Sequence, residues 1–119
     1  MNRMPQAVRA LLIVNIVVFA TGFLLPDVGG QLVMTGALWF PANNHFGLWQ
    51  VVSYMFLHGS PGHIFFNMFA LYMFGPDIER LFGTRFFALY YFGCIVSAAI
   101  LHLAVTSWTG AAPAPMVGA

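Results

Sequence analysis

Residues 57–67 read Leu57-His58-Gly59-Ser60-Pro61-Gly62-His63-Ile64-Phe65-Phe66-Asn67. Ser60 followed by Pro61 predicts a helix start, because serine caps free backbone N–H groups and proline suits the first helical position. His63 then lies in the first turn, and Asn67 follows four residues later on the same face. Two hydrogen-bond donors are thus stacked beside the positive end of a helix dipole, in an otherwise apolar segment. We predict an oxyanion-binding site inside a membrane.

The composition indicates an integral membrane protein. Of the 119 residues, 61% are hydrophobic and 6% are charged, whereas soluble proteins carry roughly 25% charged residues. The net charge of +1 rests on four Lys and Arg residues, which provide no basic surface for a phosphate backbone. This excludes nucleic acid as an expected partner and leaves the lipid bilayer as the expected environment.

Three apolar stretches are long enough to cross roughly 30 Å of hydrocarbon at about 1.5 Å per residue. They cover about residues 8–25, 61–82 and 85–108. Pro26 is expected to end the first stretch. Gly75-Pro76 is expected to kink or end the second, with Gly83 as its C-terminal stop. We therefore predict an all-α membrane protein in which residues 1–119 belong to one domain with three transmembrane helices.

The connection over about residues 26–60 is longer than a passive loop needs. Its aromatic and aliphatic residues predict a segment that lies at the membrane interface. These residues are Leu38, Trp39, Phe40, Phe46, Leu48 and Trp49. Two interpretations remain open, because the tryptophans either only anchor the segment at the interface or belong to a loop that covers a site.

The arginines predict the orientation, because positively charged loops stay in the cytoplasm. Arg3 and Arg9 precede the first span, and Arg80 and Arg85 lie between the second and third spans. Residues 27–57 and the tail after residue 107 contain no Lys or Arg. We therefore expect a multi-pass protein of the inner or plasma membrane with a cytoplasmic N-terminus. His63 then lies near the outer face.

Several motifs, taken in order, resemble the N-terminal half of the rhomboid intramembrane serine proteases. They are Trp49-Gln50, Tyr54-Met55-Phe56-Leu57-His58, His63, Asn67-Met68, Phe74-Gly75, Glu79, Gly83 and Arg85-Phe86. The resemblance extends over about residues 49–87. Residues 116–119 also resemble the approach to the family's Gly-x-Ser nucleophile motif. Gln50 departs from the pattern, because the family often has arginine after the tryptophan.

The resemblance implies a rhomboid-like helical bundle of six or more spans, of which this chain holds helices 1–3. In that family a serine that begins the fourth span pairs with a histidine on the sixth. His63 and Asn67 match the oxyanion-stabilising pair, and His58 matches a histidine with a structural role. The implied substrates are transmembrane segments of membrane proteins, cleaved with no cofactor or metal.

The Ser/His dyad itself is expected to lie outside this chain, which ends one residue before the position of the serine. None of the serines or histidines here matches the two dyad positions. They are Ser53, Ser60, Ser97 and Ser107, and His45, His58, His63 and His102. Glu79 and Arg80 are expected to fix a helix end or the following loop. The chain by itself is therefore predicted to be inactive.

Other interpretations remain beside this one. His63 and Asn67 could form a buried polar pair that serves packing alone. His45, His58 and His63 could bind zinc or copper, although no carboxylate or thiol is near in the sequence. The N-terminal apolar run could be a secretory signal, but it has no small-residue cleavage site. The strongest alternative is a non-catalytic rhomboid-like protein that binds membrane clients.

Overall fold

The structure, a computed structural model, describes residues 4–39, 44–109 and 117. The elements are all helices: α1 (Gln6–Leu24), α2 (Pro26–Gly36), α3 (Gln50–Ser53), the 3₁₀ helix η1 (Tyr54–Phe56), α4 (Pro61–Phe82) and α5 (Thr84–Thr109). This confirms the all-α prediction. The three long helices begin and end within two residues of the predicted apolar stretches.

Two helices in the described part of the chain, α1 and α5, are long and apolar enough to cross a membrane. Helix α4 is of comparable length, but it contains His63 and Asn67 near its start and Asp77, Glu79 and Arg80 near its end. These polar residues lower its mean hydropathy. That α4 also crosses the membrane therefore stays a prediction.

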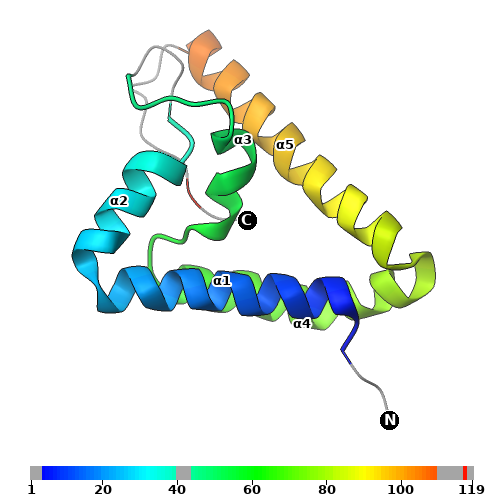
Figure 1. The fold of residues 1–119 in the computed structure, drawn as a ribbon. Helices are drawn as coiled ribbons and strands as arrows, with labels where there is room; N and C mark the ends of the chain where they lie inside the picture. Colours follow the sequence, from blue (N-terminus) through cyan, green and yellow to red (C-terminus); the bar gives the residue numbers. More distant parts are fainter. Residues whose placement is uncertain (1–3, 40–43, 110–116, 118–119) are drawn as a thin grey trace.

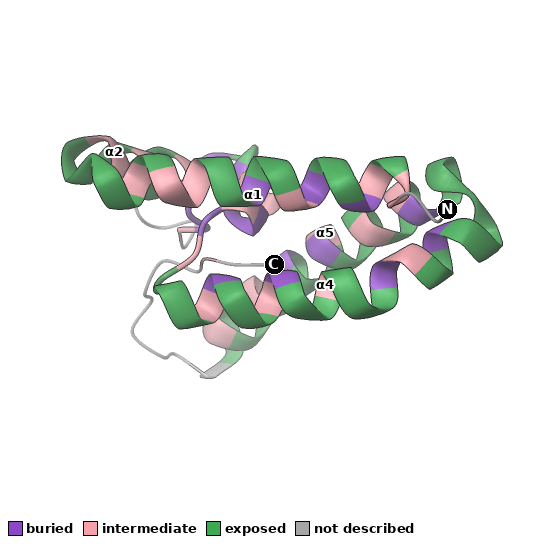
Figure 2. Ribbon diagram, turned by 90° about the horizontal axis from the view of Figure 1, so that it is seen from below, coloured by how far each residue is buried: buried purple, intermediate pink, exposed green. Residues whose placement is uncertain are grey.

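The three long helices have an open, triangular arrangement (Figure 1). Helices α1 and α4 pack side by side and antiparallel, and α5 turns away from the end of α4 at an angle. Helix α2 lies on the side opposite this turn, and α3 and η1 lie between α2 and α5. Buried residues face the space that these helices enclose, whereas the outer faces are exposed (Figure 2).

Glu79 joins the start of α1 to the end of α4. Its carboxylate accepts the backbone N–H groups of Ala7 and Val8, both at 2.9 Å, and the Thr84 hydroxyl at 2.7 Å. The first N–H groups of a helix have no partner within the helix, so a buried carboxylate satisfies them well. This supports the expected structural role of Glu79. Arg80 forms an ion pair with Asp77 at 3.6 Å.

Gly75-Pro76 does not end α4, because the helix continues through Pro76 to Phe82. It ends at Gly83, as predicted, where φ is 92° and the N–H bonds to the Glu79 carbonyl at 2.7 Å. The missing side chain of Gly75 instead serves the contact with α1. A methyl group there would lie 2.8 Å from Cγ2 of Val8.

Helix α2 forms the first part of the connection over residues 26–60, for which no helix was predicted from the sequence. Pro26 ends α1 and also begins α2 as its first residue, a position at which proline loses no hydrogen bond. The two helices meet at a pair of glycines, since a Cβ atom at Gly29 would lie 2.6 Å from the Gly22 carbonyl oxygen. Side chains at this point would separate α1 from α2.

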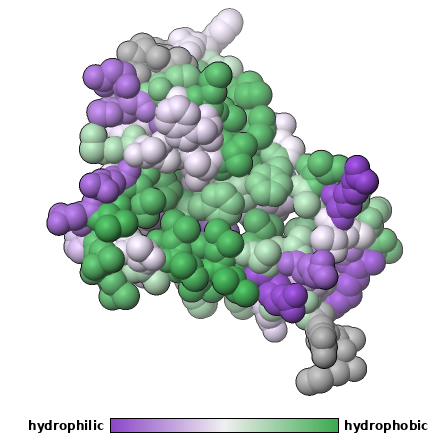
Figure 3. Space-filling view, in the orientation of Figure 1, coloured by the Kyte–Doolittle hydropathy of each residue, from purple (hydrophilic) through white to green (hydrophobic). Residues whose placement is uncertain are grey.

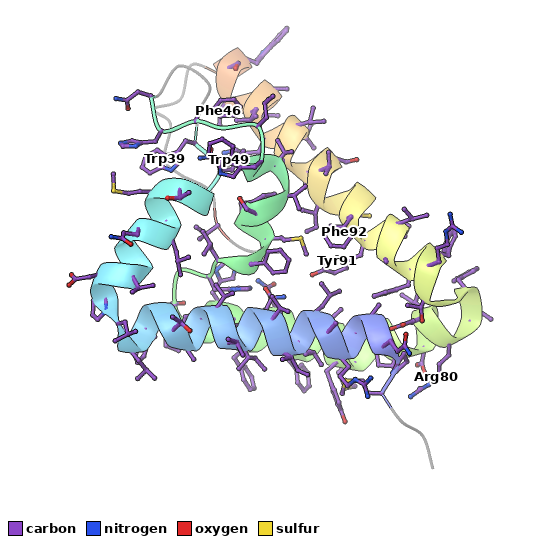
Figure 4. The ribbon with its side chains drawn as sticks, in the orientation of Figure 1. Trp39, Phe46, Trp49, Arg80, Tyr91 and Phe92 are labelled. Atoms are coloured by element: carbon purple, nitrogen blue, oxygen red, sulfur yellow. The ribbon has the colours of Figure 1, made fainter. Side chains whose placement is uncertain are left out.

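Helix α5 packs against α3 and is hydrogen-bonded to η1. The buried Tyr54 hydroxyl donates to the Ile95 carbonyl at 2.7 Å. Tyr91 points inward from α5 and packs against the same core (Figure 4). Elsewhere large apolar side chains such as Phe66, Phe74 and Leu89 are exposed.

Hydrophilic residues gather mainly at the corner where α1 begins and α4 turns into α5, and along α2 and the segment beyond it (Figure 3). Arg80 lies at this first corner (Figure 4). Apolar residues dominate the surface between these two regions. An apolar band between polar ends fits a chain that contacts lipid.

Candidate functional site

The first turn of α4 has the predicted cap. Ser60 is extended, with φ −159° and ψ 161°, and its side-chain oxygen accepts the backbone N–H of His63 at 3.1 Å. Pro61 takes the first helical position. The helix therefore starts where the sequence predicts, and this start fixes the direction in which the next two turns present their side chains.

The His63 ring is half-buried and accepts a hydrogen bond from the preceding loop. Its Nδ1 atom accepts the backbone N–H of Gly59 at 3.2 Å. In a neutral imidazole one nitrogen accepts and the other donates, so this contact assigns the proton to Nε2. His63 therefore has an N–H donor at Nε2, and no hydrogen bond in the described part of the chain uses it.

Asn67 lies one turn further along α4, and its side chain is half-buried. Its Nδ2 atom is buried and has no hydrogen-bond partner among the described residues. Buried polar atoms are nearly always paired in folded proteins, so such an atom needs an explanation. The structure thus places two unused donors, on His63 and Asn67, on consecutive turns of one helix.

His58 packs edge-on against His63, with the ring centroids 5.0 Å apart and the ring planes at 69°. Burial and the neighbouring His63 lower the pKa of His58 to about 4, against a smaller opposing effect of the Phe56 backbone. Its two ring nitrogens are buried and lack a partner with hydrogen-bonding geometry among the described residues. His58 is therefore a neutral wall beside His63 at physiological pH.

The lowered pKa of His58 predicts that stability falls in mild acid. The reference pKa is 6.5 and the folded value is about 4. Between these values the unfolded chain binds a proton that the folded chain excludes, so the free energy of unfolding decreases as the pH falls from 6.5 toward 4. We expect a lower thermal midpoint in detergent at pH 5.0 than at pH 7.5.

The variant His58→Gln isolates the share of His58 in this pH effect, because glutamine does not titrate. The difference in thermal midpoint between pH 5.0 and pH 7.5 is expected to shrink in the variant. An equal difference in both proteins would show that His58 is already free to bind a proton in the folded state.

Val117 lies beside the same loop, although 58 positions separate it from Gly59. A methyl group at Gly59 would lie 3.8 Å from Cγ2 of Val117 and 4.0 Å from Nδ1 of His63. The chain after α5 therefore comes back to the N-terminus of α4. Both distances are ordinary van der Waals contacts, so the approach does not depend on glycine at this position.

An apolar cavity of about 640 Å³ adjoins the site. Its walls come from the second half of α1, from α2 and from residues 56–61, including His58, Gly59 and Ser60. Helix α2 therefore forms one wall of a space that reaches the start of α4. Of the two interpretations of the connection, this geometry favours a segment that covers a site.

Gln50 supports this connection from within. It is fully buried, and its side-chain oxygen accepts the Trp39 N–H at 3.2 Å. Its side-chain nitrogen, Nε2, donates to the carbonyls of Thr35 at 3.1 Å and His45 at 2.7 Å. An arginine could make the two donor contacts but could not accept the N–H. Glutamine instead of arginine at this position therefore suits surroundings that present both a backbone N–H and backbone carbonyls.

The two tryptophans close the end of α2. The Trp39 indole donates to the Val33 carbonyl at 3.1 Å, and the Trp49 indole donates to the Thr35 carbonyl at 2.7 Å. Both lie with Phe46 where α2 ends beside α3 (Figure 4). Interface anchoring does not describe them fully, since Trp49 satisfies a carbonyl near the end of α2, and Trp39 adds a second hydrogen bond to the Val33 carbonyl, which also accepts the Ala37 N–H. Phe40 lies outside the described residues.

The structure gives other roles to several candidate residues. The Ser53 hydroxyl donates to the Gly36 carbonyl at 2.8 Å, and Ser60 caps α4. The His45 ring packs against Trp39, with centroids 5.0 Å apart. Within residues 4–39, 44–109 and 117, no group of three His, Cys, Asp or Glu residues could hold a metal ion. The metal interpretation therefore finds no support in this part of the chain.

Neither the hydrogen bonds of Gln50 nor the burial of Asn15 was predicted from the sequence. Asn15 is fully buried in α1, and its Oδ1 atom has no partner among the described residues. A signal for Asn15 was present, because a polar residue in the middle of an apolar span is costly and marks function more often than chance. Arg3 and residues 116, 118 and 119 lie outside the described residues.

Two comparisons with known proteins agree with this geometry. Residues 45–119 match the Rhomboid domain family. The chain is also 30% identical over 77 residues to the Rhomboid-like protease 3 of Toxoplasma gondii, which covers 65% of this chain and 29% of that protein. The chain thus spans less than a third of the curated relative that it matches. On these matches, the protein belongs to the rhomboid family.

Proposed function

We propose that this chain is part of an intramembrane serine endopeptidase that cleaves transmembrane segments of other membrane proteins. The observation that carries the proposal is the pair of unused donors, His63 Nε2–H and Asn67 Nδ2, on consecutive turns at the start of α4. Packing alone gives no reason to leave two such donors unpaired. A developing oxyanion is a partner that both donors fit.

The nucleophile in this proposal is a serine at position 120, three residues beyond Val117. The approach of Val117 to Gly59 supports this placement, because the next residues continue from a point beside His63. If α1, α4 and α5 all cross the membrane, a fourth span begins on the same face as α4. The N-termini of these two helices, with their free N–H groups, then lie at one level.

The proposed reaction is acyl transfer. The serine hydroxyl attacks the carbonyl carbon of the scissile peptide bond, and its proton passes to a histidine base on a later span. The carbonyl oxygen becomes an oxyanion, which accepts hydrogen bonds from Nε2 of His63 and Nδ2 of Asn67. Donors of this kind are typically worth about 3–4 kcal/mol each in the transition state. The intermediate then collapses, the scissile C–N bond breaks, and the amine leaves with the proton that the histidine holds. Water, deprotonated by the same histidine, hydrolyses the acyl-serine ester to a carboxylate and the free serine, and no cofactor takes part.

The substrate class follows from the surroundings of these donors. The cavity beside residues 56–61 is lined mainly by apolar residues of α1 and α2. Such a space admits the side chains of a substrate segment that has left its helix. We infer that substrates with small or helix-destabilising residues near the outer membrane face are favoured, because they unwind at lower cost.

A non-catalytic protein that binds membrane clients is the second candidate function. It is favoured by the exposed apolar faces of α4 and α5, which offer binding area without any chemistry. It gives no reason for the donors of His63 and Asn67. The two candidates separate in one experiment, because both bind a transmembrane segment but only the protease cleaves it.

The experiment uses the complete protein that contains this chain, reconstituted in liposomes with a single-span substrate. We expect two products, with the cut located by mass spectrometry in the half of the segment nearest the outer face. The 119-residue chain serves as the control and is expected to leave the segment intact. Binding of the segment without any cleavage by the complete protein would favour the client-binding candidate.

The proposed orientation makes a separate prediction. With a cytoplasmic N-terminus, the connection that holds α2 lies outside and the turn between α4 and α5 lies inside. Gly30 and Asp77 suit single cysteine substitutions, because a Cβ at Gly30 meets nothing within 4 Å and the Asp77 side chain is 86% exposed. In a Cys94→Ala background, an impermeant thiol reagent should label Gly30→Cys from outside and Asp77→Cys only after permeabilisation. Labelling of both from one side would contradict this topology.

A further inference from the structure

Two carboxamides in α1 and α4 have complementary groups that the fold does not use. Asn15 is fully buried, and its Nδ2 atom donates to the Leu11 carbonyl at 2.7 Å. This bond fixes the orientation of the amide and leaves Oδ1 as a buried acceptor with no partner among the described residues. Asn67 has the opposite deficiency, since its buried donor Nδ2 has no partner there.

The packing of α1 on α4 places the two asparagines at nearly the same height. At one end Val8 lies against Gly75, and at the other end Phe19 lines a groove with Pro61, Ile64 and Phe65. The register of this antiparallel pair therefore puts Asn15 opposite about residue 68, at about 1.5 Å of rise per residue. Asn67 is adjacent to that level.

Both asparagines also lie on the inner side of the helix pair. The outer groove between α1 and α4 is lined from α1 by Leu12, Ile16 and Phe19, and neither asparagine contributes to it. Asn15 shares its helix face with the buried Val8 and Leu11 instead. Asn67 shares its face with His63. The unused acceptor, Oδ1 of Asn15, and the unused donor, Nδ2 of Asn67, therefore face the same interior region.

We propose that Asn15 is a positioning residue for Asn67, acting through one bridging water. The water accepts one N–H of the Asn67 amide and donates to Oδ1 of Asn15, so it pairs both unused groups at once. A buried water needs two to four polar partners and the space of about one water molecule, and such bridges are nearly as favourable as direct hydrogen bonds. This inference rests on the proposed function, in which the second N–H of Asn67 faces the oxyanion.

The link explains why α1 carries a polar residue in its buried middle. An asparagine there is costly in lipid, and its bond to Leu11 uses only one half of the amide. Thr21 is the instructive contrast in the same helix. Its hydroxyl also bonds to the carbonyl four residues back, that of Val17 at 2.8 Å, but its side chain is exposed and faces no other polar group of the site.

The test is a double-mutant cycle between Asn15→Leu and Asn67→Ala in the complete protein, with kcat and KM measured for a single-span substrate. Asn15→Leu alone should lower kcat by roughly 3–10-fold, the factor expected for one neutral hydrogen bond, and leave KM unchanged. In the Asn67→Ala background it should lower kcat no further, because nothing remains to be positioned. Thr21→Val is the matched control and should keep wild-type kcat.

Two further measurements keep the test independent of protein stability. Asn15→Asp, neutral in the buried site, keeps both a donor for Leu11 and an acceptor for the water, and should retain kcat within about twofold. In the 119-residue chain, hydrogen exchange of the Asn67 side-chain amide, followed by NMR, should become faster in Asn15→Leu and stay unchanged in Thr21→Val.

The outcomes separate this inference from the proposed function. If Asn67→Ala lowers kcat but Asn15→Leu has no effect, or the same effect in both backgrounds, the link between the asparagines is overturned and the oxyanion role stands. If Asn67→Ala leaves kcat unchanged, both are overturned. Loss of kcat in Asn15→Asp to the level of Asn15→Leu would also contradict the link.

Discussion

Replacing His63 by alanine in the complete protein is expected to lower kcat by roughly 10²–10³, with little change in KM. The reason is that the imidazole Nε2–H is proposed to bond to the oxyanion, which exists only in the transition state and the intermediate. A donor that acts only there raises kcat and leaves substrate binding unchanged. The factor corresponds to about 2.7–4 kcal/mol of transition-state stabilisation.

The fold should tolerate this substitution. His63 is half-buried, and its ring makes one hydrogen bond, from the Gly59 N–H, beside the exposed residues 59–62. Asn67→Ala should lower kcat in the same direction. Phe66→Ala is a suitable control from the same helix turn, because Phe66 is 71% exposed and its side chain has no hydrogen-bond donor. Near-normal kcat in the doubly substituted His63→Ala, Asn67→Ala protein would favour a polar pair that serves packing alone.

The geometry at the start of α4 could be predicted from the sequence because its signals are local. Ser60 and Pro61 determine where the helix begins, and the helical period then stacks Asn67 on His63. The lengths of the three long helices follow equally from predominantly apolar runs and from Gly83, where the chain takes a positive φ. The roles of His63 and Asn67 in catalysis stay predictions.

Other features depend on contacts between distant residues and could not be predicted in this way. Helix α2 contains Gly29 and Gly30, which are poor helix formers, and its position depends on the close approach of Gly29 to Gly22. The approach of Val117 to Gly59 joins residues that are 58 positions apart in the sequence. The role of Gln50 depends on three backbone groups, those of Trp39, Thr35 and His45. The sequence alone indicates only that glutamine stands where the family often has arginine.

We predict that the nucleophile lies outside residues 1–119, and covalent labelling gives a clear answer because the reaction either occurs or does not. A fluorophosphonate probe reacts with a serine that is activated by a base and placed beside oxyanion donors. In this chain Ser53 and Ser60 are held by backbone contacts. Ser97 and Ser107 lie on α5. The 119-residue chain is therefore expected to remain unlabelled, whereas the complete protein is labelled.

Mass-spectrometric identification of the labelled residue in the complete protein shows where the nucleophile lies. We expect one modified site, a serine at position 120, and loss of the label when that serine is replaced by alanine. Labelling should also weaken in His63→Ala, since the phosphonyl oxygen uses the same donors. Labelling at one of the four serines of this chain, or none in the complete protein, would contradict the proposal that α4 supplies the oxyanion half of a serine protease.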